Sequence, residues 1–422
     1  MAVVQQNNSL EYISYKEIKN ILTIKIVIYD DNESLLKDAI DKLNKNGGKI
    51  YINTTIINFK EKSVLEINGI KNGEIIGIKQ ANGQYPILNF RKQREMNYNL
   101  NGIVISGSNK LLQNIIIENC GASGIIVSGE RNTLDHIITR YNLGSGIEFY
   151  NTSETTTINY CYSYRNFGSN YGNNGNGFTF NGGFNIKYNY CFAWDNSDNG
   201  FSSNTVNEIN NIYSIAYYHS ASWNNGNVDI FSGKYDYSNG DPLDKNLWTI
   251  QQIIDSDKDF EDNYKNKKYN INNASINGEN ANEYFSKANG NMKGNGFEFG
   301  NKGKNSENQN KAENCIAFNH KSIGFDNFGN QKSIGLIINC VSFNNGINYQ
   351  LPFNYDKWEN NWSWNAKTKE QNLMNQILKK PNNANSYQKL TYSINEIIVN
   401  AVNKNSFPDN INFDLLINTL VE

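Results

Sequence analysis

The chain is poor in the residues that mark disulfide-bonded, zinc-binding and membrane-spanning proteins. Its 422 residues include five prolines, five cysteines and three histidines. The cysteines are odd in number and form no CxxC pair, which argues against a disulfide framework or a zinc site. No apolar run reaches the roughly 18 residues that a membrane-spanning helix needs, so we expect no membrane span.

An excess of charge of either sign is also lacking. Lysine and arginine together number 39 against 41 aspartates and glutamates, which gives a net charge of −2. Without a basic excess or a stripe of lysine and arginine, a nucleic-acid partner is not expected. The N-terminus shows no basic segment followed by an apolar segment and a small-residue cleavage site. Composition alone leaves open a cytoplasmic protein or a secreted one whose signal peptide has been removed.

A short glycine-led phrase recurs along the chain. Gly102, Gly124 and Gly146 follow one another at intervals of 22 residues. The phrase returns less regularly at Asn176–Phe178, Asn199–Phe201, Asn295–Phe297, Ile323–Phe325 and Asn345–Ile347. A period in this range is typical of a solenoid, in which each repeat packs only on its neighbours. Each repeat divides into two short strands without a helix between them. The sequence therefore predicts an all-β fold, a single-stranded parallel β-helix.

The second strands of the repeats can be aligned in register, and three columns result. A column of small residues holds Cys161, Cys191, Ser220, Cys315 and Cys340. An aromatic column holds Tyr164, Trp194, Trp223, Phe318 and Phe343. A third column holds Asn142, Asn166, Asn196, Asn225, His320 and Asn345. Because neighbouring strands lie about 4.8 Å apart, asparagine amides in such a column can hydrogen-bond from coil to coil. We predict a buried cysteine column and a structural asparagine ladder that includes His320.

The N-terminal part of the chain has a helical pattern. Asp31–Asn46 carries apolar residues at helical spacing, can be capped at Asn32, and ends at two glycines. A helix at this place would cover the open strand edges of the first coil. Residues 1–90 are therefore assigned to an N-terminal cap with the first irregular coils, and residues 91–350 to the β-helix.

The repeat is interrupted once and fades near the C-terminus. Residues 229–292 form an insertion with two short helical patterns, Leu247–Ile254 and Ala281–Ala288. An insertion of this length often shapes a lid or a cleft wall. Residues 351–422 are assigned to a C-terminal cap, in which two predicted helices close the end of the coil, Gln371–Leu378 and Ile411–Leu420.

Four motifs resemble those of family 9 polysaccharide lyases and follow one another in the same order. They are Asn174–Phe178, Ala193–Ser202, Gly294–Gly300 and Asn319–Asn327. The resemblance covers roughly residues 100–350. It implies a pectate-lyase-like right-handed parallel β-helix at the cell surface or outside the cell. It also implies calcium-assisted β-elimination on a uronate-containing, pectate-like polysaccharide.

The resemblance also assigns roles to individual residues. In such an enzyme, calcium held by carboxylates neutralises the uronate, and a lysine removes the C5 proton. The ligand positions fall on Asn176, Asp198, Asn199 and Ser202, with Asp195 nearby, so only one of the four aspartates is kept. Amide and hydroxyl oxygens carry less charge than carboxylates, so the metal site is expected to be weak. No other cofactor is expected.

The position of the family's lysine is occupied by Glu298, a weak base for a carbon acid because its unperturbed pKa is about 4.3. Lys293, Lys302 and Lys304 lie close in sequence and are the substitute candidates for the catalytic base, with Lys302 preferred. Arg165, Tyr171 and Tyr217 are candidates for binding the sugar.

Three functions remain open. The first is a lyase with an altered site that acts on an acidic polysaccharide. The second is a non-catalytic β-helix that binds glycans through aromatic side chains. The third is a structural or self-assembling surface protein, because long coils can stack. The sequence does not indicate an oligomeric state.

Overall fold

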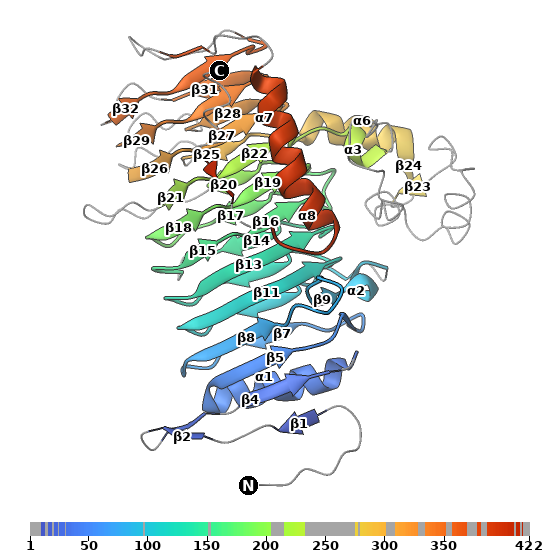
Figure 1. Ribbon diagram of the computed structural model, residues 1–422. Coiled ribbons are helices and arrows are strands. Elements are labelled where there is room, and N and C mark those ends of the chain that lie inside the picture. The colour runs from blue at the N-terminus through green and yellow to red at the C-terminus, as the bar shows by residue number, and fades with distance from the viewer. Residues whose placement is uncertain are drawn as a thin grey trace.

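The structure is a computed structural model in which the chain winds into a solenoid of stacked coils (Figure 1). It describes residues 10–12, 16–18, 21–23, 25–29, 31–95, 98–150, 153–203, 215–232, 275–276, 279–300, 309–327, 334–351, 357–368, 378–380, 386–408, 411–413 and 416. Nearly all the strands in this part of the chain pair in parallel within two long sheets. The predicted parallel β-helix is confirmed.

The smaller sheet is built from the glycine-led phrases, as the repeat predicted. Its nine described strands are β7 (Leu65–Ile67), β10 (Ile103–Ile105), β12 (Ile125–Val127), β14 (Ile147–Phe149), β17 (Phe178–Phe180), β20 (Phe201–Ser203), β25 (Phe297–Glu298), β28 (Ile323–Asp326) and β31 (Ile347–Gln350). The residue after each repeat glycine from Gly102 to Gly324 points into the core. The rings of Phe178 and Phe201 stack there 4.8 Å apart, and those of Phe201 and Phe297 stack 4.7 Å apart. The phrase predicted at Asn345–Ile347 is out of register, because Ile347 pairs with Ile323 and Asn348 takes the position of the glycine.

The larger sheet forms the rest of each coil. Its first described strands are β1 (Leu10–Tyr12), β4 (Lys25–Ile28), β5 (Gly48–Ile52), β6 (Ile56–Asn58), β8 (Gly73–Gly77), β9 (Ile87–Asn89), β11 (Lys110–Glu118) and β13 (Thr133–Arg140). The later strands come in pairs: β15 (Thr157–Asn159) and β16 (Tyr162–Tyr164), β18 (Ile186–Asn189) and β19 (Phe192–Trp194), β21 (Ile215–Tyr218) and β22 (Ala221–Trp223), β26 (Gln309–Glu313) and β27 (Ile316–Phe318), β29 (Ile334–Ile338) and β30 (Val341–Phe343), and β32 (Lys357–Glu359) and β33 (Trp362–Trp364).

The pairs correct the prediction of one second strand per repeat. In the later coils a residue with positive φ separates the two strands of a pair, for example Tyr160 at 49°, Tyr190 at 54° and His219 at 49°, whereas β11 and β13 remain single strands. Tyrosine seldom takes up this left-handed conformation, so the bends at Tyr160 and Tyr190 could not be predicted from the residue type. Each later coil therefore has three short strands instead of two.

The asparagine ladder is present and buried. Asn142 Nδ2 donates to Asn166 Oδ1 over 2.9 Å, and Asn166 Nδ2 donates to Asn196 Oδ1 over 3.0 Å. His320 continues the column, with Nε2 3.0 Å from the carbonyl oxygen of Ser222. Burial lowers the pKa of His320 to about 3, so the imidazole is neutral and donates from Nε2. The five cysteines are unbridged and buried, as the small column predicted.

The predicted N-terminal helix is α1 (Glu33–Asn46), and it packs on the first coils (Figure 1). The side chain of Asn32 accepts a hydrogen bond from the backbone N–H of Leu35 and caps the helix. Leu36, Ala39 and Ile40 are buried in the same core as the strands. The hairpin of β2 (Lys16–Ile18) and β3 (Ile21–Thr23) precedes this cap, and the short α2 (Arg91–Glu95) follows it.

The C-terminal helices lie in a different place from the one predicted. They are α7 (Ser386–Ile394), the π-helical η2 (Asn395–Val399) and α8 (Asn400–Asn403). They run back along the side of the coil instead of across its end (Figure 1). The reason is an apolar outer surface on the larger sheet, against which Leu390, Ile394 and Phe407 are buried. The predicted helices Gln371–Leu378 and Ile411–Leu420 fall almost entirely outside the described residues.

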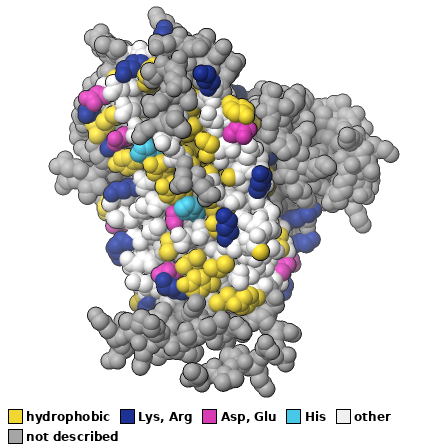
Figure 2. Space-filling model, in the orientation of Figure 1, with side chains coloured by type: hydrophobic (Ala, Val, Ile, Leu, Met, Phe, Trp, Pro, Cys, Tyr) yellow, Lys and Arg dark blue, Asp and Glu magenta, His cyan; other side chains and the backbone are white. Residues whose placement is uncertain are grey.

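The coil also continues beyond residue 350. Strands β32 and β33 add to the larger sheet, and the ring of Trp364 stacks 4.5 Å from that of Phe343. Within the part of the chain that is described, no helix is both long and apolar enough to cross a membrane. Charged side chains of both signs are scattered over the face seen in Figure 2, without a basic stripe among the described residues.

The insertion is described at its two ends. They contain α3 (Asp229–Ser232), β23 (Ser275–Ile276), β24 (Glu279–Asn280) and α6 (Ala281–Asn291). Helix α6 confirms the helix predicted at Ala281–Ala288, and Leu247–Ile254 lies outside the described residues. In α6 the ring of Tyr284 lies 4.8 Å from that of Tyr171, so this helix supports the loop before β17.

Candidate functional site

An outward-facing column crosses the smaller sheet and carries most of its chemistry. In each coil from β10 to β28 it is the second residue after the repeat glycine, because side chains alternate between the two faces of a strand. We call it the outer column. It comprises Glu66, Val104, Ile126, Glu148, Thr179, Ser202, Glu298, Asp326 and Gln350.

The later half of the outer column is a buried network around Glu298. This carboxyl group is 1% exposed and accepts a hydrogen bond from Ser202 Oγ over 2.7 Å. It also receives the side-chain amides of Asn199, over 3.2 Å, and Asn295, over 3.3 Å. The amide of Asn295 lies 3.2 Å from Asp326 Oδ2 as well, so it bridges the two acidic side chains.

The surroundings of Glu298 disfavour its charged form. Burial is the largest cause, and the carboxylates of Asp326 and Asp198 add to it, whereas the hydrogen bond from Ser202 acts in the opposite direction. Together they raise the pKa of Glu298 to about 8. Its side chain is therefore mainly an uncharged carboxylic acid at neutral pH.

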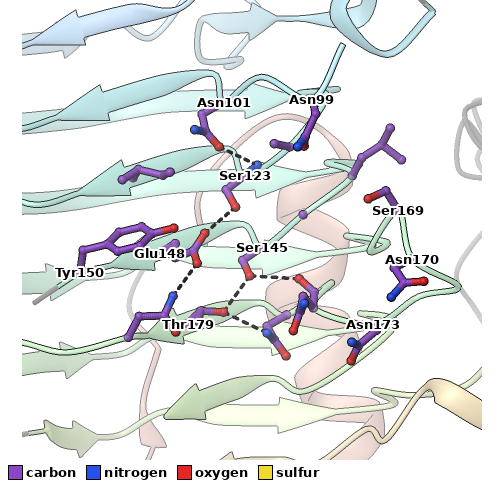
Figure 3. Close-up of a pocket in the computed structure, with 17 residues that line it drawn as sticks. Asn99, Asn101, Ser123, Ser145, Glu148, Tyr150, Ser169, Asn170, Asn173 and Thr179 are labelled. Atoms are coloured by element: carbon purple, nitrogen blue, oxygen red, sulfur yellow. Dashed lines mark hydrogen bonds between the residues drawn. The ribbon is translucent and has the colours of Figure 1, made fainter. Parts of the chain in front are cut away.

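Three members of the outer column, Ile126, Glu148 and Thr179, form the floor of an open groove of about 450 Å³ (Figure 3). The groove crosses four successive coils and ends where the buried network begins, because Asn176 and Thr179 belong to both. Its described lining is mostly amide and hydroxyl side chains, with two large aliphatic residues, two small ones, one tyrosine and one carboxylate: Asn99, Asn101, Ala122, Ser123, Ile126, Leu143, Gly144, Ser145, Glu148, Tyr150, Ser169, Asn170, Asn173, Asn174, Asn176, Thr179 and Asn181.

Glu148 stands in the groove and is held by neutral donors (Figure 3). Ser123 Oγ donates to it over 2.8 Å and Asn181 Nδ2 over 2.6 Å. The hydroxyl of Tyr150 is hydrogen-bonded to it too, and burial together with this carboxylate raises the pKa of that phenol. The side chain of Tyr150 is 41% exposed, so part of its ring remains open to a ligand.

Hydroxyl groups and one loop complete the groove. Ser145 Oγ lies 2.7 Å from Thr179 Oγ1, which also accepts a hydrogen bond from Asn176 Nδ2 over 3.0 Å. The loop Ser169–Asn174 forms one wall. From α6, the Tyr284 hydroxyl donates to the carbonyl of Ser169 over 3.5 Å, so the insertion holds this wall from outside.

Comparison with known proteins places the chain in a family. Residues 30–244, about half of the chain, match the model of the Pel9A-like right-handed β-helix region. The chain belongs to this family. The match confirms the resemblance to pectate-lyase-like β-helices that the four motifs indicated.

Solved structures agree with the Pel9A-like fold. The crystal structure of pectate lyase Pel9A is 18% identical and superposes with a TM-score of 0.56, over 93% of this chain and 89% of that one. A rhamnogalacturonan lyase is 17% identical with a TM-score of 0.52, over 79% of this chain and 77% of that one. At these identities the likeness shows the fold alone. No curated protein matches the chain.

The Pel9A-like coil brings four of the five predicted metal ligands together, but hydrogen bonds occupy most of their oxygens, and only Asp198 Oδ1 among them is buried without a hydrogen-bond partner. Asn176 Oδ1 accepts the backbone N–H of Asn199 over 2.8 Å, and Asp198 Oδ2 accepts that of Asn174 over 3.0 Å. Asn199 Oδ1 accepts the backbone N–H of Asn295 over 2.9 Å. Calcium needs six to eight oxygen ligands, and these residues do not offer them.

Two further observations concern the metal. The fifth predicted ligand, Asp195, lies apart from the others, with Oδ2 3.5 Å from Nε of Arg165. Among the described residues, no group of three or more histidine, cysteine, aspartate or glutamate side chains is arranged to hold a metal ion. The residues present therefore do not fit a calcium ion of the kind that the resemblance implied.

The predicted sugar-binding residues are corrected in part. Tyr217 is 1% exposed and lies inside the core between the rings of Phe201 and Phe297, so it cannot touch a ligand. Arg165 is 2% exposed beside Asp195, so it is not a surface group. Tyr171 is half-buried and packs outside the groove wall, as described above.

The candidate base Lys302 falls outside the described residues. The sequence interpretation missed Glu148 and Tyr150, although Glu148 was readable from its place two residues after Gly146. The signal was overlooked because the interpretation followed the family's motifs, which begin only at Asn174.

Proposed function

We propose that the protein binds a polysaccharide in the groove and does not carry out calcium-assisted β-elimination. One observation carries the proposal. The residues at the family's calcium and lysine positions form a closed hydrogen-bonded network around Glu298, while the groove beside them is open and polar.

The lining of the groove suits a sugar. Carbohydrate hydroxyls both donate and accept hydrogen bonds, and the groove offers amides and hydroxyls that do the same. The exposed part of the Tyr150 ring supplies an apolar surface for a sugar ring. The names of the two solved relatives, a pectate lyase and a rhamnogalacturonan lyase, support a polysaccharide as the ligand class. A polysaccharide ligand also favours a location outside the cell or at its surface.

The residues around Glu298 are poorly suited to β-elimination. A base must take a proton from carbon, and Glu298 is already protonated near neutral pH. The charge that a uronate brings would meet further acidic side chains, Asp198 and Asp326, and the positive charge of Lys293 only partly offsets them at Glu298 and Asp198. Elimination by a base outside the described residues, such as Lys302, is the rival outcome of the experiment.

Affinity electrophoresis through gels that contain soluble polysaccharides tests the proposal. We expect at least one polysaccharide to retard the protein equally with calcium and with a chelator. The same mixtures should show no growth of the ultraviolet absorbance of an unsaturated uronate. Retardation by no polysaccharide of a broad panel, or a calcium-dependent rise in absorbance on polygalacturonate, would contradict it.

A further inference from the structure

We infer that the groove selects a neutral polysaccharide and discriminates against uronate polymers. The inference rests on the proposed function, because it names the charge of the ligand that the groove takes. It departs from the pectate-like ligand that the sequence motifs implied.

The first step is the charge of the groove. Glu148 is the only charged side chain among the described residues that line it. No lysine or arginine stands opposite this carboxylate in that set. Lys287 of α6 comes near the outer wall, but its Nζ lies 5.7 Å over the ring of Tyr171, which does not line the groove.

The second step is the position of Glu148. It is the outward residue of β14, the third strand of the four whose coils the groove crosses, and its neighbours in the outer column are Ile126 and Thr179. A chain lying across these strands must pass over the carboxylate. Further along the same column lie two more acidic groups, Asp326 and the mainly uncharged Glu298, and none of the column's described members is basic.

The third step separates neutral from cationic ligands. If the groove were built to bind an amino sugar, the carboxylate of Glu148 would lack hydrogen-bond donors whenever no sugar is bound. Glu148 already receives hydrogen bonds from Ser123, Asn181 and Tyr150, all of them uncharged. Glu148 therefore needs no cationic ligand to satisfy its hydrogen bonding. Its remaining lone pairs can accept charge-assisted hydrogen bonds from sugar hydroxyls.

A uronate meets the opposite situation. Its carboxylate would lie beside Glu148 in a partly enclosed groove, where like charges repel strongly and water screens them less than at an open surface. A neutral hydroxyl in the same place gains a hydrogen bond. The groove therefore distinguishes the two by charge more than by shape.

The experiment compares three polysaccharides of matched length by affinity electrophoresis or calorimetry: a neutral galactan or glucan, polygalacturonate and chitosan. The wild-type protein should bind a neutral polymer at least ~10-fold more tightly than either charged one. In Glu148→Gln, which removes the charge but keeps the size of the side chain and one accepting oxygen, the ratio of neutral to anionic binding should fall several-fold. Glu66→Gln is the matched control, since Glu66 belongs to the outer column but lies outside the groove lining.

The possible outcomes are distinct. Binding of polygalacturonate or chitosan as tight as that of the neutral polymer overturns the inference but leaves the proposed function standing. Binding of no polysaccharide overturns the proposed function itself. Should Glu148→Gln not fold, salt provides a second measurement in the wild-type protein. Raising the ionic strength should strengthen polygalacturonate binding and leave neutral binding unchanged, and a weakening of polygalacturonate binding would overturn the inference.

Discussion

At the scale of single residues, His320 is the member of the asparagine ladder that is not an asparagine. Its ring is fully buried and its Nε2 donates to a backbone carbonyl, which an asparagine amide does in the neighbouring coils. The histidine is tolerated because the neutral imidazole offers the same donor. It differs from asparagine in one respect, since it can be protonated.

This difference predicts an acid sensitivity. The folded-state pKa of about 3 lies below the ordinary value of 6.5, so between these values the unfolded chain binds the proton more readily. The stability is therefore complete above pH 6.5 and falls as the pH drops, by up to about 1.4 kcal/mol per pH unit. In His320→Asn this contribution should vanish.

Urea unfolding of the wild-type protein and His320→Asn at pH 7.5 and pH 4.5 measures the effect. The urea midpoint of His320→Asn minus that of the wild-type protein should be larger at pH 4.5 than at pH 7.5. An equal response of both proteins to acid would contradict the account of His320.

Tyr150 is the residue through which the groove should contact a sugar ring. Removing its ring in Tyr150→Ala should cost about 1 kcal/mol of binding, or ~5-fold in Kd, because the exposed part of the ring no longer covers the ligand. Tyr392→Ala is the control, as Tyr392 is 66% exposed on α7 and far from the groove lining. Equal affinity of both variants in glycan titrations would exclude Tyr150 from the binding surface.

At the scale of elements, the repeat glycines decide how tightly the coils close. A methyl group on Gly146 would overlap the side-chain oxygens of Ser163 and Thr139, and both are buried. Neighbouring coils hold these atoms in place, so there is little room for relaxation. The glycine is required by this close approach, since its φ is not positive.

Gly146→Ala should therefore destabilise the protein by about 1–3 kcal/mol, as overpacking of a filled core does. Gly290→Ala is the matched control: Gly290 lies in α6 and nothing stands within 4 Å of an added methyl group. Alanine favours a helix, so this control should be neutral or slightly stabilising. Denaturant unfolding compares the two, and equal stabilities would contradict the packing argument.

Much of the coil could be predicted from these elements, because the glycine phrase and the columns recur where parallel strands stack. The bends inside the second strands could be read only in part. Asn314 and Asn339 carry the usual residue type for a positive φ, whereas Tyr160 and Tyr190 do not. The groove was harder to find, since Glu148 is chemically an ordinary exposed glutamate until the fold places Ser123 and Asn181 beside it.

At the scale of the whole molecule, the C-terminal segment acts as a strap along the larger sheet. The ring of Phe407 lies 4.8 Å from that of Tyr85 and 5.2 Å from that of His136, so the segment touches coils far from it in sequence. The sequence could not predict this contact, because a stripe of outward apolar residues shows that a surface is covered but not by which segment.

Phe407→Ala should loosen the strap while leaving the coil intact. Losing a buried phenylalanine costs about 3 kcal/mol, which corresponds to roughly 100-fold faster local opening of the segment. Limited proteolysis should then cut the C-terminal segment much faster than in Tyr392→Ala. Equal cleavage rates would show that this contact does not hold the strap.

The protein is a Pel9A-like β-helix, and we propose that its groove binds a neutral polysaccharide beside the hydrogen-bonded network at the calcium and lysine positions. A crystal structure of the protein soaked with a neutral oligosaccharide and calcium tests both parts at once. We predict sugar density over Glu148 and Tyr150, and no calcium among Asn176, Asp198, Asn199 and Ser202. Calcium bound at those four residues, with the groove empty, would contradict the account.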